Sequence, residues 1–189
     1  MIKRLLFLFI LFISVSAGAQ KVAAPKIVFL KGYLVNDKGD TIRGEVKYNP
    51  KKEQDCYTKV FFKDEAGVQK NYKPKKAKAY GFEDKDFVAM DFENELKYYR
   101  VMTAGDINLY KMMYEMISMN QPVIGAIYFI SRKDDKDLTE VKEGKFKKQM
   151  SDWMKDNTDF INNFEDSKDF NAESATEVIK QYNAWKASH

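Results

Sequence analysis

Between residues 27 and 132 the chain alternates apolar and polar side chains with a period of two, and this pattern constrains its fold more than any other feature. In Thr41–Tyr48, Ile42 and Val46 fall on one side while Arg43 and Glu45 fall on the other. Successive side chains of a β-strand point to opposite faces of a sheet, so the pattern predicts strands with one buried face. Beyond residue 137 the spacing becomes helical, which predicts a second part of different structure.

A β-hairpin is predicted over residues 27–48. Residues 27–35 are rich in β-branched and aromatic side chains, and Asn36–Asp40 supplies turn residues, with Gly39 able to adopt a positive φ. Turn residues then recur at roughly 8 to 12 residue intervals, which is typical of an antiparallel sheet. Further strands are predicted at 57–63, 68–72, 78–82, 87–92, 97–103 and 123–132.

Residues 107–119 fit two structures. Ile107, Leu109 and Met113 alternate as in a strand, whereas Leu109, Met112 and Met116 have helical spacing. A turn at 120–122 separates this segment from the strong strand predicted at 123–132. We therefore favour a strand over 107–119 that forms a hairpin with 123–132.

The C-terminal part predicts helices that need a surface to cover. A first amphipathic stripe starts at Phe146, and a cap at 156–159 precedes a short second helix. Ser174–Glu177 has the capping-box pattern and predicts the start of a last helix. The apolar residues of these helices are Phe146, Met150, Trp153 and Met154, then Phe160, Ile161 and Phe164, then Val178, Ile179, Tyr182 and Trp185.

Together these patterns predict one α+β domain over residues 20–189, mainly β over 27–132 and mainly α over 144–188. The expected architecture is an antiparallel β-sheet or partly open barrel of about eight to ten strands, followed by two or three C-terminal helices packed on it.

Residues 1–19 have the pattern of a secretory signal peptide. Lys3 and Arg4 precede an unbroken apolar run at 5–13, and Ala17–Ala19 forms an A-x-A cleavage site. The run is too short to cross a bilayer as a helix, so no transmembrane span is expected after cleavage. Loss of Lys3 and Arg4 lowers the formal charge from +4 to +2, which gives no reason to expect nucleic acid as a partner. The location is expected to be periplasmic or extracellular.

The counts of cysteine and histidine restrict the chemistry. Cys56 is the one cysteine, so an internal disulfide is excluded, and His189 is the one histidine and stands at the C-terminus. Cys/His and Ser/His catalysis and His-rich zinc sites are therefore not expected. The acidic turn at 134–137 lacks the spacing of a calcium loop. No catalytic residue, metal ligand or cofactor is predicted.

Three groups of side chains are candidates for binding. Tyr98, Tyr99, Tyr110 and Tyr114 are the predicted ligand-binding residues, as a stacking face for a glycan or peptide. The lysines of 73–78 offer a basic cluster for an anionic glycan or lipid head group, although a solubilising loop explains them as well. Soft thioethers at 112–119 select Cu(I), but core packing is the favoured explanation for these methionines.

Several short motifs resemble those of functionally uncharacterised small exported proteins of Bacteroidetes-type bacteria. The opening Lys31-Gly32-Tyr33, followed by G-D-T-I-R-G-E-V at 39–46, is similar to their K-G-Y…G-D-T-I-x-G-x-V. The matches F-K-D-x-x-G at 62–67, Y-K-P at 72–74, F-K-K at 146–148 and Y-N at 182–183 extend the resemblance over most of the chain. Asn157 stands where relatives often have cysteine. The hairpin from Gly32 to Gly44 also resembles, more faintly, the first hairpin of carboxypeptidase-regulatory-like β-sandwiches.

These observations lead to one favoured function and two alternatives. The favoured one is a non-enzymatic exported protein of the bacterial envelope that binds an envelope protein, glycan or lipid through its sheet or a sheet–helix groove. The first alternative is a carboxylate-dependent hydrolase of glycans or envelope components, for which two acids about 5 to 10 Å apart in a cleft are required. The second is a structural envelope component.

Overall fold

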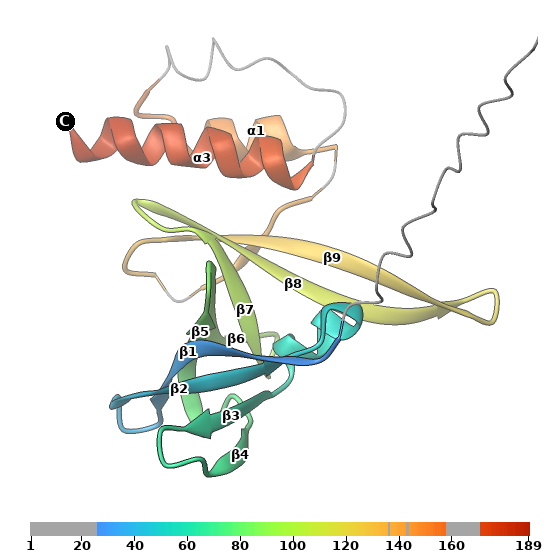
Figure 1. Ribbon diagram of the computed structural model, residues 1–189. Coiled ribbons are helices and arrows are strands. Elements are labelled where there is room, and N and C mark those ends of the chain that lie inside the picture. The colour runs from blue at the N-terminus through green and yellow to red at the C-terminus, as the bar shows by residue number, and fades with distance from the viewer. Residues whose placement is uncertain (1–25, 136, 143, 158–170) are drawn as a thin grey trace, which may run out of the picture.

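The strands of the chain form one open antiparallel sheet. The computed structural model describes residues 26–135, 137–142, 144–157 and 171–189. In these residues a 10-stranded sheet has the order β10-β9-β8-β7-β6-β5-β1-β2-β3-β4, so β10 and β4 are its edges (Figure 1). The strands are β1 Val28–Asn36, β2 Thr41–Tyr48, β3 Val60–Asp64, β4 Gln69–Tyr72, β5 Ala77–Phe82, β6 Lys85–Phe92, β7 Glu95–Thr103, β8 Ile107–Ser118, β9 Gln121–Arg132 and β10 Thr139–Glu140. The sheet with helices after it confirms the α+β prediction.

The first hairpin forms as the sequence predicts, because its turn is specified locally. The Asn36 Oδ1 atom accepts the backbone N–H groups of Lys38 and Asp40, each at 2.9 Å. Gly39 has φ +98°, which a side chain would disfavour. Strand β1 then also pairs with β5, and this long-range pairing joins the first hairpin to the rest of the sheet.

The segment between β2 and β3 is a 3₁₀ helix, η1 Pro50–Tyr57, and not the start of a strand. Asn49 caps it by accepting the N–H of Lys51 at 3.1 Å. The predicted strand at 57–63 was wrong at its beginning, since Tyr57 ends η1 and β3 starts at Val60. Helix η1 lies against β7 and β8 and carries Cys56 and Tyr57 into the core.

A first core fills the inner face of the curled sheet and is dominated by rings. Tyr80 stacks on Phe87 with ring centroids 4.7 Å apart, and Tyr98 meets Tyr80 edge-on at 4.9 Å. Burial of such rings contributes large apolar area to the fold. The buried residues of this first core are Leu34, Val46, Cys56, Tyr57, Val60, Phe62, Ala77, Tyr80, Phe82, Phe87, Tyr98, Tyr99, Tyr110, Met112 and Phe129.

A second core lies on the opposite face of β8 and β9, under the helices. Helix α1 spans Phe146–Trp153 and helix α3 spans Ala172–Ala187, and both lie over these strands (Figure 1). Leu109 points into this second core while its neighbour Tyr110 belongs to the first, as a strand period of two requires. The second core contains Ile107, Leu109, Ile130, Val141, Phe146, Met150, Met154, Ala175, Val178, Ile179 and Tyr182.

Two boundaries in this region differ from the sequence predictions. Residues 107–119 do form a strand, but the turn is centred on Met119 and Asn120, so that Gln121 and Pro122 already belong to β9. Helix α3 starts earlier than predicted, because Asn171 caps it and forms the capping box with Ser174. The signal peptide at 1–19 and the short helix predicted to carry Phe160, Ile161 and Phe164 lie outside the described residues.

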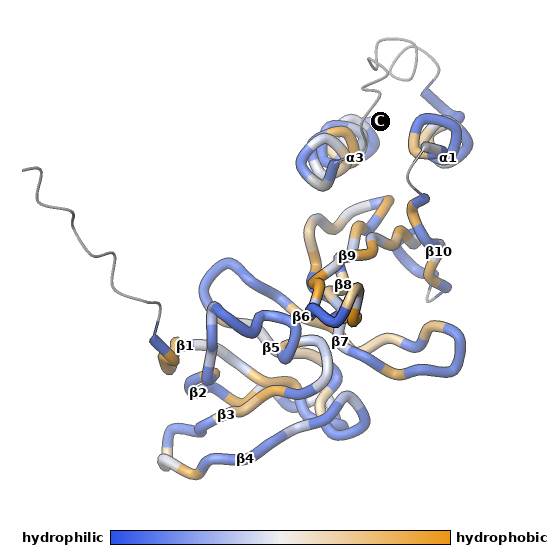
Figure 2. Tube along the Cα trace, turned by 90° about the vertical axis from the view of Figure 1, so that its right-hand side faces the viewer, coloured by the Kyte–Doolittle hydropathy of each residue, from blue (hydrophilic) through white to orange (hydrophobic). Residues whose placement is uncertain are grey.

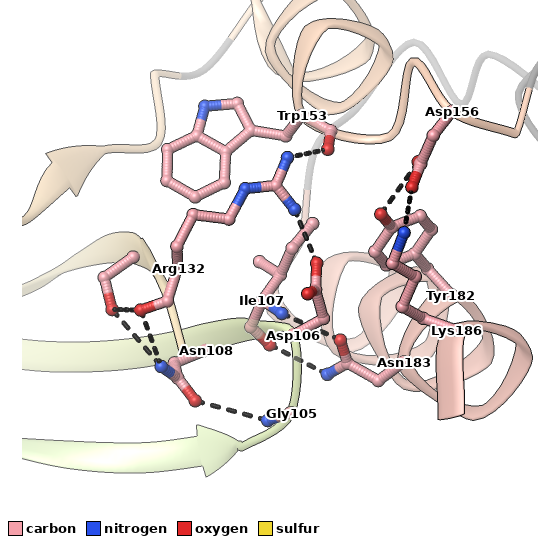
Figure 3. Close-up of polar contacts among 11 residues, drawn as sticks. Gly105, Asp106, Ile107, Asn108, Arg132, Trp153, Asp156, Tyr182, Asn183 and Lys186 are labelled. Carbon is pink, nitrogen blue, oxygen red and sulfur yellow. Dashed lines mark hydrogen bonds and ion pairs between the residues drawn. The ribbon is translucent and has the colours of Figure 1, made fainter. Parts of the chain in front are cut away.

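Polar contacts fix the helices on the sheet (Figure 3). The Asn183 side chain donates to the Ile107 carbonyl at 2.8 Å and accepts the Ile107 N–H at 2.9 Å. A β-carbon at Gly105 would collide with the Asn183 side chain, so the glycine leaves room for this contact. Arg132 binds Asp106 at 2.6 Å and donates to the Trp153 carbonyl oxygen. The helical part is thereby held in one register on β8 and β9.

Candidate binding cleft on the outer sheet face

The four predicted binding tyrosines do not share an exposed face. Tyr98, Tyr99 and Tyr110 have exposed fractions of 0%, 1% and 8% and belong to the first core. Only Tyr114, on the distal part of β8, is partly exposed. Their burial follows from the curl of the sheet, which covers β7 on both faces: Tyr98 packs on Tyr80, and Tyr99 packs on Phe129. A ligand therefore has access to Tyr114 alone among the four.

The other sequence candidates are separated as well. Met112 belongs to the first core and Met113 packs against it, whereas Met116 and Met119 are exposed toward the end of the β8–β9 hairpin, so the four thioethers do not form one group. The lysines of 73–78 are all exposed, three of them in the turn between β4 and β5 and Lys78 at the start of β5, and Lys76 lies 3.8 Å from Asp37. Among the described residues, no group of three or more His, Cys, Asp or Glu side chains is placed to share a metal ion.

Cys56 is enclosed in the first core. It is a free thiol with an exposed fraction of 8%, and burial raises its pKa to about 11. A thiol with so high a pKa is protonated at neutral pH and is a poor nucleophile. His189 stacks on Trp185 at the end of α3 with ring centroids 5.0 Å apart, far along the chain from η1. In the described part of the chain, no helix is long and apolar enough to cross a membrane.

A cleft of about 720 Å³ lies across β5, β1, β2 and β3. Its charged residues Lys31, Arg43 and Glu45 alternate with the buried Leu34 and Val46 along the same strands, so they project from the face opposite the first core. The sheet pairing brings these strands together in the order β5-β1-β2-β3. The cleft is lined by Lys31, Gly32, Tyr33, Arg43, Gly44, Glu45, Lys63, Asp64, Glu65, Gly67, Gly81, Phe82 and Glu83.

Glycines shape the floor of this cleft. Gly32 and Gly44 are opposite each other in the β1–β2 ladder. A β-carbon at Gly32 would collide with the Gly81 carbonyl oxygen, and one at Gly44 with the carbonyl oxygen of Lys63. Glycines at such positions allow a close approach of neighbouring backbones where a sheet bends. The motif glycines of the sequence thus have a structural role at the cleft.

An aromatic ring forms one wall. Tyr33 lies over Gly81, where a β-carbon would meet its ring, and its hydroxyl donates to Asp86 Oδ1 at 2.7 Å. Burial, followed by this hydrogen bond, raises the pKa of Tyr33 to about 12. The ring is therefore neutral and held in one orientation at neutral pH. A fixed ring of this kind offers a flat apolar surface next to polar groups.

Most of the carboxylates in the cleft already have a partner. Glu45 pairs with Lys63, and Glu83 lies 3.9 Å from Lys85. Asp64 accepts the Val68 N–H at 2.9 Å and so fixes the β3–β4 turn. These contacts assign Glu45, Asp64 and Glu83, three of the four acids that line the cleft, to holding its shape.

Two cations, in contrast, have no ion pair or hydrogen bond to the described residues. Lys31 and Arg43 are both exposed on adjacent strands, one register step on either side of the Gly32–Gly44 pair. Arg43 is directly opposite Tyr33. Their donors are therefore available to a ligand that lies against the Tyr33 ring.

Two exposed phenylalanines extend this surface along the same face. Lys63 lies over the ring of Phe29 at 4.8 Å, and Lys47 lies over that of Phe61 at 5.3 Å. Cation–π contacts of exposed lysines keep such rings oriented. This face was not predicted as a binding site, although the alternation within residues 41–48 placed Arg43 and Glu45 on its outer side. Comparison with known protein families, curated proteins and solved structures finds no match to the chain.

Proposed function

We propose that this protein is an exported, non-enzymatic binding module of the bacterial envelope that holds a glycan in the cleft of β1, β2, β3 and β5. The observation that supports this most is the pair of unpartnered cations, Lys31 and Arg43, beside the fixed ring of Tyr33. The signal-peptide pattern of residues 1–19 supports export.

The mixture of charges favours a polyhydroxylated ligand over an anion. The cleft combines the donors of Lys31 and Arg43 with the carboxylate acceptor of Glu65. Sugar hydroxyls both donate and accept hydrogen bonds, so they suit such a lining, whereas an anion would be repelled by the carboxylates. The face of Tyr33 offers the apolar surface against which a sugar ring packs. A neutral or weakly charged glycan is therefore the proposed ligand.

Binding without turnover is favoured over hydrolysis because of the state of the acids. A glycosidase needs one carboxylic acid and one carboxylate placed on either side of the scissile bond. In this cleft Glu45 is paired with Lys63, and Asp64 is committed to its turn. These contacts hold both groups in structural roles.

The test is calorimetric titration of the purified protein with oligosaccharides prepared from bacterial envelopes, comparing the wild type with Arg43→Ala and Lys31→Ala. We expect each substitution to weaken binding roughly tenfold, as loss of a hydrogen bond from a charged donor does. Lys180→Ala removes an exposed lysine of α3 and is the matched control. Unchanged affinity in both cleft variants would contradict the proposed site.

The same oligosaccharides also distinguish binding from hydrolysis. We expect no new reducing ends after prolonged incubation with the wild-type protein. Release of reducing ends that Glu65→Gln abolishes would show an enzyme in place of a binding module. Export is tested separately by N-terminal sequencing of protein recovered from the periplasm or the medium, for which we expect Gln20 as the first residue.

A further inference from the structure

The distal part of the β8–β9 hairpin is a ribbon of two strands that pair only with each other. The last β7–β8 pair is Arg100 with Lys111, and β10 reaches β9 only at residues 129 and 130, with one further bond to the Tyr128 carbonyl. Residues 112–127 therefore have no other neighbouring strand within the described chain. Figure 1 shows this ribbon projecting beyond the body of the molecule, at the right of the view.

The end of this ribbon is apolar on both faces and at its apex. Met116 pairs with Val123 on one face, and Ile117 and Ile124 project from the other. Ile117 has an exposed fraction of 80% and Met119 one of 97%. Residues 116–131 contain no charged side chain. We call Met116, Ile117, Met119, Val123 and Ile124 the apolar tip, and the hydrophobic colour of β8 and β9 is visible in Figure 2.

The apex of the hairpin has a long apolar side chain, Met119, at a position whose left-handed backbone conformation disfavours such a residue. Met119 and Asn120 have φ values of +50° and +61°. Two-residue hairpin turns with positive φ at both positions prefer Asn-Gly or Asp-Gly, and a left-handed conformation is costly for a long side chain. Met119 is also almost fully exposed, so it contributes nothing to packing, and the fold itself does not account for an apolar side chain at this strained position.

We propose that the apolar tip inserts into the surface of a lipid bilayer. A bilayer presents the same apolar medium to both faces and to the apex, whereas a groove on a protein takes one face. From Met116 to the apex the ribbon extends roughly 10 Å, which matches the depth of the boundary between head groups and acyl chains. Only the end of the ribbon enters, and only to the level of the head groups, so the backbone groups at its unpaired strand edges keep access to water.

Charges at the base of the ribbon support this orientation. Helix η1 lies against β8, and its Gln54 donates to Glu115 at 3.1 Å. Lys51 and Lys52 at the start of η1 are exposed and have no ion pair among the described residues. Because η1 packs against β8, these lysines are close to the ribbon, together with the exposed acids Asp55 and Glu115, and they are the groups that favour anionic head groups there.

A second copy of the chain is the less suitable occupant. The free edge of β8 runs from Met112 to Ser118, and symmetric antiparallel pairing about its middle would place Glu115 directly opposite Glu115 of the second copy. Like charges directly opposite each other destabilise a sheet. On the β9 edge Pro122 lacks an N–H group and interrupts pairing.

The experiment is flotation of the purified protein with vesicles of phosphatidylethanolamine and phosphatidylglycerol. We expect the wild type to float with them, and Met119→Asn and Ile117→Ser to reduce the bound fraction roughly tenfold. Val68→Ser is the matched control, since Val68 is 48% exposed on the other side of the sheet, before β4. Met119→Asn suits the left-handed turn better than Met119, so loss of binding by this variant cannot be ascribed to loss of folding.

Further arms separate the outcomes. The double variant Lys51→Ala, Lys52→Ala is expected to float less with anionic vesicles, and its flotation is expected to depend less on salt. Arg43→Ala is expected to leave flotation unchanged, because the cleft is a different site. The proposal is overturned if the wild type floats with no vesicle, or if Met119→Asn floats like the wild type. It is also overturned if light scattering shows a dimer that Ile117→Ser converts to monomers, since the tip would then bind a second copy.

Discussion

The two faces of β8 and β9 are covered by different chemistry, and the difference shows how each core is specified. The first core is closed by rings, and the hydroxyls of Tyr57 and Tyr98 are buried with no hydrogen-bond partner among the described residues. The second core is mostly aliphatic, and polar contacts such as that of Asn183 with Ile107 surround it. Close packing and buried apolar area thus stabilise the first core, whereas hydrogen bonds and ion pairs of defined geometry position the elements around the second.

The largest effect on stability is expected from alkaline pH, which destabilises the first core. Burial raises the pKa of Tyr57, Tyr80 and Tyr98 well above the ordinary value, and that of Tyr99 to about 12. A raised pKa contributes stability that is complete below about pH 10, the unfolded value, and is lost as the pH rises through the folded value. We expect cooperative loss of the β-sheet circular dichroism signal at about pH 12 or just below.

The measurement combines this signal with tyrosinate absorbance at 295 nm. The buried tyrosines should ionise together with unfolding, after the exposed ones have titrated. Complete titration of all tyrosines near pH 10 with an intact sheet would show that the first core admits water, and would remove the distinction between the two cores.

The second prediction compares the two ends of the same strand. Leu109→Ala leaves a cavity in the second core, where Leu109 is fully buried, and should lower the free energy of unfolding by about 2–5 kcal/mol. Ile117→Ala at the apolar tip should change it by less than about 0.5 kcal/mol. Urea denaturation measures both. Equal effects would mean that the distal ribbon is covered in solution.

The third prediction concerns the contact that positions α3. Asn183→Ala removes two hydrogen bonds and leaves the Ile107 backbone groups to find other partners, so a loss of about 1–3 kcal/mol is expected. Gln181→Ala is the control, because the hydrogen bond of Gln181 among the described residues goes to Glu177 on the exposed side of the same helix. Thermal unfolding of the two variants measures the difference. Similar losses would assign the stability of α3 to its apolar face alone.

The contrast between local and long-range specification also decides what the sequence alone predicts. The β1–β2 hairpin is predictable because Asn36 and Gly39 encode its turn, and α1 because Phe146, Met150 and Met154 have helical spacing. Helix η1 is missed because its polar sequence resembles a loop. The burial of both Tyr98 and Tyr99 is missed because the curl of the sheet covers both faces of β7, and alternation within one strand does not report it.

The candidate cleft is a further product of long-range pairing. Lys31 and Arg43 are recognisable as outward residues of a hairpin, but their relation to Tyr33 and Gly81 depends on the pairing of β1 with β5. No local pattern encodes that pairing, since the residues between the two strands include four other elements, β2, η1, β3 and β4. Strand order thus had to come from the structure.

The smallest expected effect is a gain of stability at the apolar tip, and it separates function from folding most clearly. Met119→Asn replaces a residue with φ +50° by one that tolerates the left-handed region, so the free energy of unfolding should rise by roughly 0.5–1 kcal/mol. Urea denaturation of this variant beside Ile117→Ser, which keeps the strained turn, measures the gain. If Met119→Asn is more stable and yet binds vesicles less, the methionine serves a contact outside the fold at the expense of stability. If the variant is instead destabilised, Met119 packs against the chain in solution, and the ribbon belongs with the two cores and not apart from them.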